Sequence, residues 1–127
     1  MFQLGPRSKM RLNGVHPDLV KVVERAIHIT TVDFTVLEGV RDPLRQKKLV
    51  EAGSSWTLNS RHITGHAVDL GAWVDDQVDW SWPLYQQIAA AMKTAAKELN
   101  VPIVWGGDWR PQYKDGPHFE LPRKEYP

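Results

Sequence analysis

The 127-residue chain contains no cysteine and no long apolar segment. Without cysteine, it can form neither a disulfide framework nor a thiolate zinc site, and it has no cysteine nucleophile. No run approaches the roughly 18 to 20 consecutive apolar residues that span a bilayer, so we expect no membrane insertion. Any metal site in this chain must therefore be built from His, Asp and Glu.

An excess of charge of one sign is also missing. The chain has 16 Lys and Arg against 15 Asp and Glu, a formal net charge of +1. No basic run with interleaved aromatic residues is present, so we expect no nucleic-acid partner. The first residues, Met1 to Lys9, have no apolar core and no small-residue cleavage site, unlike a secretory signal. We therefore expect the protein to be made soluble in the cytoplasm, so that something else must let it through if its target lies outside.

Length and composition predict a single domain over residues 1–127. The hydrophobic share of 42% and the charged share of 24% are ordinary for a globular protein. Short helical and extended segments are mixed without repeats, which favours the α+β class. Six tryptophans are many for this length. For four of them we expect core packing, with the lining of a binding groove as the alternative: Trp73, Trp80, Trp82 and Trp105.

Periodicity and capping residues predict the elements. Helices are expected where apolar residues recur at helical spacing, namely from His16-Pro17-Asp18 through Ile27, from the N-cap Asp42 to Gly53, and from Ser81 to near Asn100. Strands are expected over 33–39, 67–70, 103–105 and 118–121. Loops are expected over 54–66, 75–80 and 106–117.

Two polar segments, residues 60–69 and 115–121, lie at loop–strand junctions, where a rigid sheet can direct side chains. A catalytic zinc site needs three protein ligands and one position left for water. Zinc lowers the pKa of that water to about 7, and a carboxylate outside the ligand set then transfers the proton. The two segments supply the required groups, with ligands and a base drawn from His62, Asp69, His118, Asp115 and Glu120.

The order of these residues is specific. The first segment reads Ser60-x-His62-x-x-Gly65-x-Ala67-x-Asp69 and the second reads Asp115-x-x-His118-x-Glu120-Leu121. Together they resemble the signature of the zinc D-Ala-D-Ala (LAS-type) peptidase family. Two upstream segments resemble the phage L-alanyl-D-glutamate endopeptidases within it: Arg11-Leu12-x-Gly14-Val15-His16-Pro17-Asp18-Leu19, and Glu38-Gly39-Val40-Arg41 followed by Gln46 and Gly53.

The resemblance implies a small antiparallel sheet flanked by helices, of the hedgehog/D-Ala-D-Ala-peptidase type. It implies zinc as the cofactor, held by His62, Asp69 and His118. Asp115 is implied as the catalytic carboxylate. Arg41 is implied to polarise the scissile carbonyl or to steady the oxyanion, and Ser60 to hydrogen-bond substrate or a ligand residue.

The implied activity is hydrolysis of the L-alanyl-D-glutamate bond in the peptidoglycan stem peptide. The implied role is that of a monomeric phage or prophage endolysin, which waits in the host cytoplasm and reaches the periplasm and cell wall once the membrane is permeabilised. Two alternatives stay open at this point. One is a D,D-carboxypeptidase or dipeptidase that acts on D-Ala-D-Ala; the other is a catalytically inactive, zinc-containing module that binds wall peptides.

Two residue assignments also have rivals. Glu120 shares a strand face with His118 and could act near the metal, while Asp115-Gly116 is a common turn pair; we favour Asp115 as the base. His66 follows His62 by four positions, a spacing that pairs zinc ligands on a helix. Gly65 and the predicted strand behind it argue against a helix there, so His66 is interpreted as a neighbour of the site.

Overall fold

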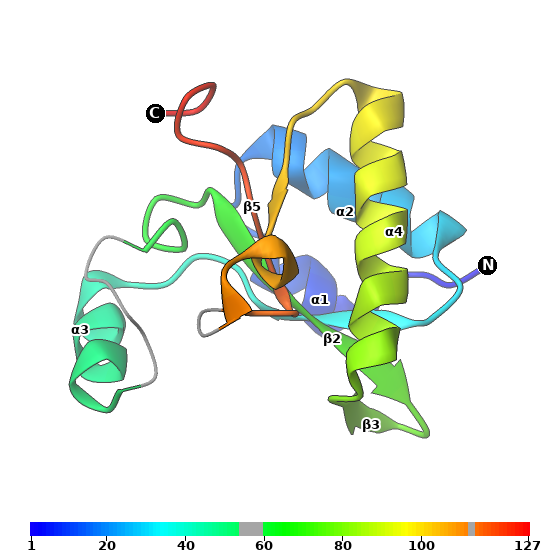
Figure 1. The fold of residues 1–127 in the computed structure, drawn as a ribbon, viewed down its shortest axis with the longest axis horizontal. Helices are drawn as coiled ribbons and strands as arrows, with labels where there is room; N and C mark the ends of the chain where they lie inside the picture. Colours follow the sequence, from blue (N-terminus) through cyan, green and yellow to red (C-terminus); the bar gives the residue numbers. More distant parts are fainter. Residues whose placement is uncertain (54–59, 112–113) are drawn as a thin grey trace.

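The structure is a computed structural model that describes residues 1–53, 60–111 and 114–127. Within these residues the elements follow one another as α1 (Pro6–Arg11), α2 (Pro17–Ile29), β1 (Phe34–Glu38), α3 (Pro43–Glu51), β2 (Ala67–Val74), β3 (Gln77–Asp79), α4 (Trp82–Leu99), β4 (Val104–Trp105), the 3-10 helix η1 (Gly106–Asp108) and β5 (His118–Glu120) (Figure 1). No helix in the described ranges is long and apolar enough to cross a membrane.

The strands form one antiparallel sheet in the order β1-β2-β5-β4, and β3 folds back onto β2. The strand β2 pairs with β1, β3 and β5, so it organises the sheet. Its residue Asp69 lies opposite His118 of β5 on one side and opposite Glu38 of β1 on the other. The predicted α+β architecture, a small antiparallel sheet with flanking helices, is confirmed.

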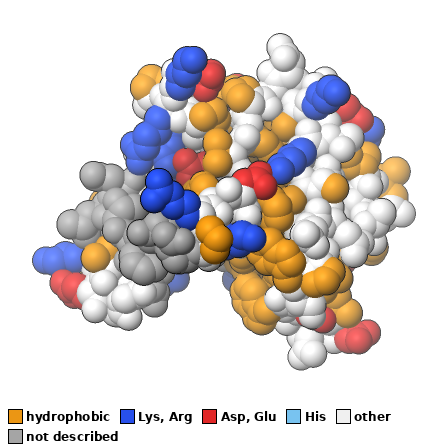
Figure 2. Space-filling model, in the orientation of Figure 1, with side chains coloured by type: hydrophobic (Ala, Val, Ile, Leu, Met, Phe, Trp, Pro, Cys, Tyr) orange, Lys and Arg blue, Asp and Glu red, His pale blue; other side chains and the backbone are white. Residues whose placement is uncertain are grey.

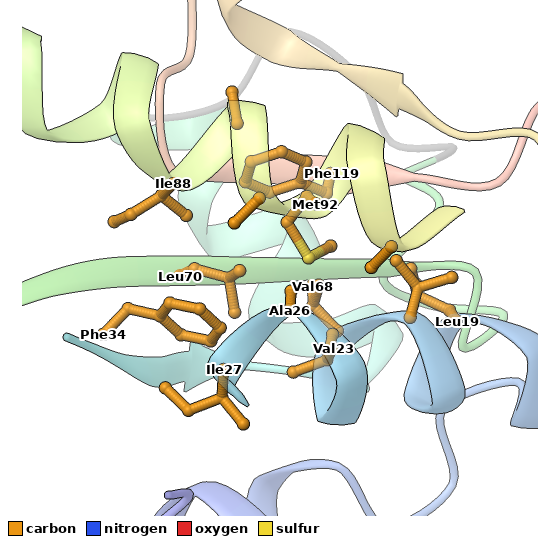
Figure 3. Packing of buried hydrophobic residues seen from close by; sticks show 14 of the residues in the cluster. Leu19, Val23, Ala26, Ile27, Phe34, Val68, Leu70, Ile88, Met92 and Phe119 are labelled. Carbon is orange, nitrogen blue, oxygen red and sulfur yellow. The ribbon is translucent and has the colours of Figure 1, made fainter. Parts of the chain in front are cut away.

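Alternation along the strands separates the apolar core from the polar residues of the sheet. Val68 and Leu70 of β2 and Phe119 of β5 are fully buried in the hydrophobic cluster. Their strand neighbours Asp69, in β2, and His118, in β5, point to the opposite face because successive side chains of a strand alternate. Figure 3 shows the cluster, to which three other elements also contribute: Leu19, Val23, Ala26 and Ile27 of α2, Phe34 of β1, and Ile88 and Met92 of α4.

Capping residues begin and end the helices close to the predicted positions. His16 precedes α2, and its Nδ1 accepts a hydrogen bond from the Asp18 N–H (3.1 Å). Asp42 precedes α3, and its carboxylate accepts from the Arg45 N–H (2.9 Å), as expected of an N-cap. Gly53 follows the end of α3 with φ of 77°, a conformation that favours glycine.

Three features differ from the predictions. Residues 75–80, predicted as a loop, contain β3, because Asp75 and Asp76 form a tight turn with φ of 52° and 62°. Hairpin turns of this kind usually carry Asn-Gly or Asp-Gly, so the Asp-Asp pair gave no hairpin signal. The helix α1 lies where no element was predicted, and the 3-10 helix η1 begins the predicted loop 106–117. Of the predicted loops, residues 54–59 and 112–113 lie outside the described residues.

The core-packing prediction for the four tryptophans is wrong for three of them. Trp73, Trp80 and Trp82 are 38%, 63% and 38% exposed, and only Trp105 among the four is buried. Trp80 and Trp82 lie at the start of α4, and Trp73 is near the end of β2. Figure 2 shows hydrophobic side chains gathered over the N-terminal part of α4 in the lower part of the view.

The backbone at Gly39, just after β1, lies very close to the N-terminal segment. A Cβ at this position would collide with the carbonyl oxygen of Arg11. Because the backbone would have to shift, we expect Gly39→Ala to lower the free energy of unfolding by about 1–3 kcal/mol in urea denaturation. Gly5→Ala is the control, since a Cβ there meets nothing within 4 Å; we expect it to cost less than about 1 kcal/mol. Equal effects of the two substitutions would contradict the close approach at Gly39.

Candidate active site

The pairing of β2 with β5 brings Asp69 and His118 together on the polar face of the sheet. A hydrogen bond from the Leu70 N–H to the Pro117 carbonyl (2.8 Å) holds the same two segments just beside them. Oδ1 of Asp69 lies 3.2 Å from Nδ1 of His118. The His118 side chain is buried. Sheet register therefore places these two side chains next to each other, although they are far apart in the sequence.

His62 reaches the same carboxylate from the turn that precedes β2. The Arg41 N–H donates to the His62 carbonyl (3.0 Å), and the His62 N–H donates to Oγ of Ser60 (3.2 Å). His62 is fully buried, and its Nε2 lies 3.1 Å from Oδ1 of Asp69. Ser60, predicted to hydrogen-bond substrate or a ligand residue, thus holds the backbone of His62 in this structure.

The outer hydrogen bond of each histidine ring decides which nitrogen faces inward. Nδ1 of His62 lies 2.8 Å from the Gly39 carbonyl oxygen, and Nε2 of His118 lies 2.8 Å from Oε1 of Glu120. A carbonyl or carboxylate oxygen can only accept, so each of these outer nitrogens carries a hydrogen. In the neutral rings, the inner nitrogens therefore direct their lone pairs at Oδ1 of Asp69.

Two lone pairs and an anionic oxygen repel one another unless a cation lies between them. The ligand atoms of His62, Asp69 and His118 lie within 4.8 Å of one another, the one such group among the described residues. Zinc binds imidazole and carboxylate when no thiolate is present, and ligating histidines usually donate their other N–H to an oxygen. The donor set of this chain, with its outer acceptors, therefore fits zinc.

The pKa values of these residues reflect the same need for a cation. Burial lowers the pKa of His118, but hydrogen bonds and charges from Asp69 and Glu120 outweigh it and raise the pKa to about 9. Burial opposes ionisation of Asp69, yet hydrogen bonds to His118 and His62 hold its pKa well below the usual range. In the metal-free protein, a proton on His118 thus provides the positive charge.

Arg41 lies on the other oxygen of Asp69. Its Nε and Nη2 donate to the two carboxylate oxygens of Glu38 (2.6 and 2.9 Å), and its Nη1 donates to Oε1 of Gln46 (2.7 Å). Nη2 also lies 3.7 Å from Oδ2 of Asp69. Desolvation alone would raise the pKa of Glu38, but hydrogen bonds and charges from Arg41 and Arg45 lower it. Glu38 therefore stays ionised and holds the buried guanidinium beside the site.

Asp115 lies at the edge of the site, in the turn that leads into His118. The residue is exposed, but its carboxyl is near enough for the charges of Asp69, His118, His62 and Arg41 to act on it. Partial loss of hydration, together with the negative charge of Asp69, raises the pKa of Asp115. A carboxyl group placed in this way, outside the three ligand atoms, can exchange a proton with a molecule bound at the site.

His66 stays outside the ligand group. Its Nδ1 is 2.7 Å from Oγ1 of Thr64, and its ring lies 5.7 Å from the ring of His16. Gly65, with φ of 77°, turns the chain between His62 and His66, so the two rings do not share a helix face. The structure thus places His66 beside the site, where the sequence interpretation has it.

Comparison with known proteins identifies the family. The family model described as phage L-alanyl-D-glutamate peptidase matches residues 1–122 of the chain. The chain belongs to this family. It is 31% identical, over 135 aligned positions, to the L-alanyl-D-glutamate peptidase of Escherichia phage T5, and the alignment covers 94% of this chain and 98% of that relative.

Two further relatives of the peptidase agree. It is 30% identical over 95 residues to the L-alanyl-D-glutamate peptidase of Listeria phage A118; this match covers 75% of the chain but only 32% of that longer protein. Its structure superposes on the crystal structure of the L-Ala D-Glu endopeptidase ChiX of Serratia marcescens with a TM-score of 0.91 and 50% identity, covering 96% of this chain and 91% of ChiX. The predicted family and fold are therefore confirmed.

The sequence interpretation missed several supports of the peptidase site. Glu38 and Gln46 belong to a segment that carries the family resemblance, but no role was predicted for either. The opposite charges of Glu38 and Arg41, three residues apart, are the signal that could have indicated their ion pair. The Gly39 carbonyl, which orients His62, leaves no signal in the sequence because every residue has one.

The lowered pKa of Glu38 predicts an acid-sensitive contribution to stability. A folded-state pKa below the unfolded value of about 4.3 means that ionised Glu38 stabilises the fold above that pH, and that this stabilisation is lost as the pH falls through the folded-state pKa. We expect the free energy of unfolding of the metal-free peptidase to fall more steeply with acidification than that of Glu38→Gln. Urea denaturation across the acidic range measures this. Parallel curves would contradict the role of Glu38; Glu51→Gln, at an exposed position, is the control and should follow the unmodified protein.

Glu120 offers a second test, because its carboxylate accepts from Nε2 of His118 and so orients that ring without belonging to the group of His62, Asp69 and His118. We expect Glu120→Ala to weaken zinc binding by about 10- to 100-fold, as the loss of such outer partners usually does. Competition with a chromophoric chelator measures the affinity directly. Glu125→Ala, at an exposed position, should bind zinc as the unmodified peptidase does. Equal affinities in all three proteins would show that His118 needs no outer acceptor.

Proposed function

We propose that this peptidase is a zinc-dependent endopeptidase that hydrolyses the L-alanyl-D-glutamate bond of the peptidoglycan stem peptide, and that residues 1–127 act as one catalytic domain. The observation that carries the proposal is the convergence of His62, Asp69 and His118, with lone pairs directed inward, in a chain of this family. The names of the relatives from Escherichia phage T5 and Listeria phage A118 support the bond that is cleaved.

Zinc, when bound by these three residues, supplies a Lewis acid and lowers the pKa of water. Asp115 accepts the proton of the attacking water and then donates it to the departing amine. Its raised pKa suits both steps, because a group that must take up and release a proton works best when its pKa lies nearer the working pH. Glu120 is less suited to this role, since it is already engaged by the N–H of His118.

Arg41 stabilises the negative charge that develops on the scissile carbonyl oxygen in the transition state. Its guanidinium is buried, and Glu38 and Gln46 fix its orientation, so little reorganisation is needed when the charge appears. Its position beside Asp69 and within range of the Asp115 charge supports this placement.

The proposed biological role is that of a phage or prophage endolysin. The protein would act as a monomer on the stem peptide after another protein has permeabilised the host membrane. Its localisation would change from the host cytoplasm to the periplasm and cell wall at that moment. The phage origin of the matching relatives supports this role.

Asp115 gives the direct test of the mechanism. We expect Asp115→Asn to lower kcat on purified sacculi by about 10²- to 10⁴-fold, the usual contribution of a general acid–base group, while zinc binding is retained. The control is Asp108→Asn, at an exposed aspartate paired with Lys93, which should leave kcat unchanged. Full activity in Asp115→Asn would move the proton transfer to Glu120. If Glu120→Gln is fully active as well, proton transfer by a carboxylate is contradicted.

The products separate the proposed bond from the alternatives. Digestion of sacculi with the zinc-loaded peptidase should create a new amino terminus on D-glutamate, detected by dinitrophenylation and hydrolysis. Release of free D-alanine would instead identify a D,D-carboxypeptidase. Zinc binding without any new amino terminus would identify an inactive module that binds wall peptides.

A further inference from the structure

The turn over residues 115–118 carries both the proposed proton-transferring carboxylate and one zinc ligand, and backbone hydrogen bonds hold it at each end. The Asp115 N–H donates to the Gly106 carbonyl (3.1 Å), which ties the start of the turn to η1. The Leu70 N–H donates to the Pro117 carbonyl (2.8 Å), which ties its end to β2. The His118 N–H also donates to the Asp115 carbonyl (3.1 Å), which closes the turn, but none of these backbone bonds engages the carbonyl of Gly116 in its middle.

A tryptophan side chain binds the Gly116 carbonyl in the middle of the turn. The indole Nε1–H of Trp105, in β4, donates to the Gly116 carbonyl oxygen at 2.7 Å, and the bond is buried. The Gly116 carbonyl is part of the Gly116–Pro117 peptide unit, one unit beyond those that flank Asp115, so this bond fixes the backbone between Asp115 and His118. A buried indole N–H needs an acceptor, and here the acceptor is the turn itself.

The Trp105 ring is itself held in place by two aromatic rings and an ammonium group. It stacks on Trp82 (centroids 5.6 Å apart, planes at 21°) and on Phe119 of the core (6.4 Å, 18°). The ammonium group of Lys93 lies 5.1 Å from its ring centre. The donor is therefore mounted on a ring that has little freedom to move away from Gly116.

Two consecutive glycines, Gly106 and Gly107, allow the ring and the turn to approach the same stretch of backbone closely. A Cβ at Gly107 would collide with the ring of Trp105, and a Cβ at Gly106 would collide with the carbonyl oxygen of Asp115. A Cβ at Gly106 would also come within 3.1 Å of Cβ of His118. The segment Trp105-Gly106-Gly107 is thus shaped to receive both its own indole and the turn.

We propose that Trp105 is a positioning residue for Asp115: its indole N–H holds the Gly116 carbonyl and thereby keeps the Asp115 carboxylate directed at the His62–Asp69–His118 group. The proposal rests on the proposed function, in which Asp115 transfers the proton. It gives Trp105 a role in the reaction that goes beyond filling the core next to Phe119.

A purely structural role predicts a different outcome from a positioning role. If Trp105 only filled space, a ring of similar shape without the N–H would preserve kcat and at most lower the melting temperature. If the N–H positions Asp115, losing it lets the turn shift and lowers kcat even where the protein is fully folded. Zinc binding should persist in either case, because strand pairing with β2 and β4 holds β5 in register.

The test replaces Trp105 by phenylalanine and, separately, by benzothienylalanine, which keeps the shape of tryptophan but has no N–H. We expect both to lower kcat on sacculi by about 10- to 100-fold, the usual effect of a misplacement near 1 Å, with KM and zinc affinity unchanged. Trp73→Phe, at a partly exposed position of β2, is the matched control and should leave all three unchanged. Unchanged kcat in the benzothienylalanine protein would overturn the proposal, as would a loss of zinc affinity that parallels the loss of kcat.

A double-mutant cycle then shows whether Trp105 acts through Asp115. In the Asp115→Ala background, Trp105→Phe should lower kcat no further, because the group that it positions is gone. An additional loss of the same size in that background would overturn the proposal. If Asp115→Ala alone leaves kcat intact, the proposed proton-transfer role of Asp115 fails, and the positioning role fails with it; if Asp115→Ala lowers kcat and Trp105→Phe does not, only the positioning role fails.

Discussion

Two imidazole nitrogens and one carboxylate oxygen face one another on the polar side of the sheet, and only a positive charge among them makes that arrangement favourable. The Gly39 carbonyl and Glu120 engage the outer nitrogens of His62 and His118, so neither ring can turn its N–H toward Asp69 without losing a buried hydrogen bond. Arg41 meanwhile lies near the second oxygen of Asp69. The surrounding hydrogen bonds therefore prepare a cation site, and the chemistry of the protein depends on what fills it.

The sheet supports this site and the hydrophobic core with the same strands. In β2, the alternation of Val68, Asp69 and Leu70 sends apolar side chains toward α2 and α4 and one carboxylate to the other face. In β5, Phe119 packs in the core, while its neighbours His118 and Glu120 serve the site. Because a shift of one residue in register would exchange the two faces, packing of the core also fixes the geometry of Asp69 and His118.

The sequence predicted the group of His62, Asp69 and His118 and the fold class, because motif spacing and apolar periodicity can both be recognised in the sequence alone. It predicted the start of α2 and both ends of α3 for the same reason, since His16, Asp42 and Gly53 are local signals. It could not predict contacts set by tertiary packing, such as the clamp of Glu38 and Gln46 on Arg41 or the indole bond of Trp105. The strand β3 was missed because its turn lacks glycine, and Trp73, Trp80 and Trp82 were misplaced because hydrophobicity alone does not say which face a ring occupies.

The most direct test of the central claim is X-ray absorption spectroscopy at the zinc edge of the purified, zinc-loaded peptidase. The account predicts one zinc per chain, with two imidazole nitrogens at about 2.0–2.1 Å and a carboxylate oxygen at about 2.0–2.2 Å. The imidazole signal should fall by half in His62→Ala or His118→Ala. A protein that binds no zinc, or a zinc environment that neither substitution changes, would contradict it.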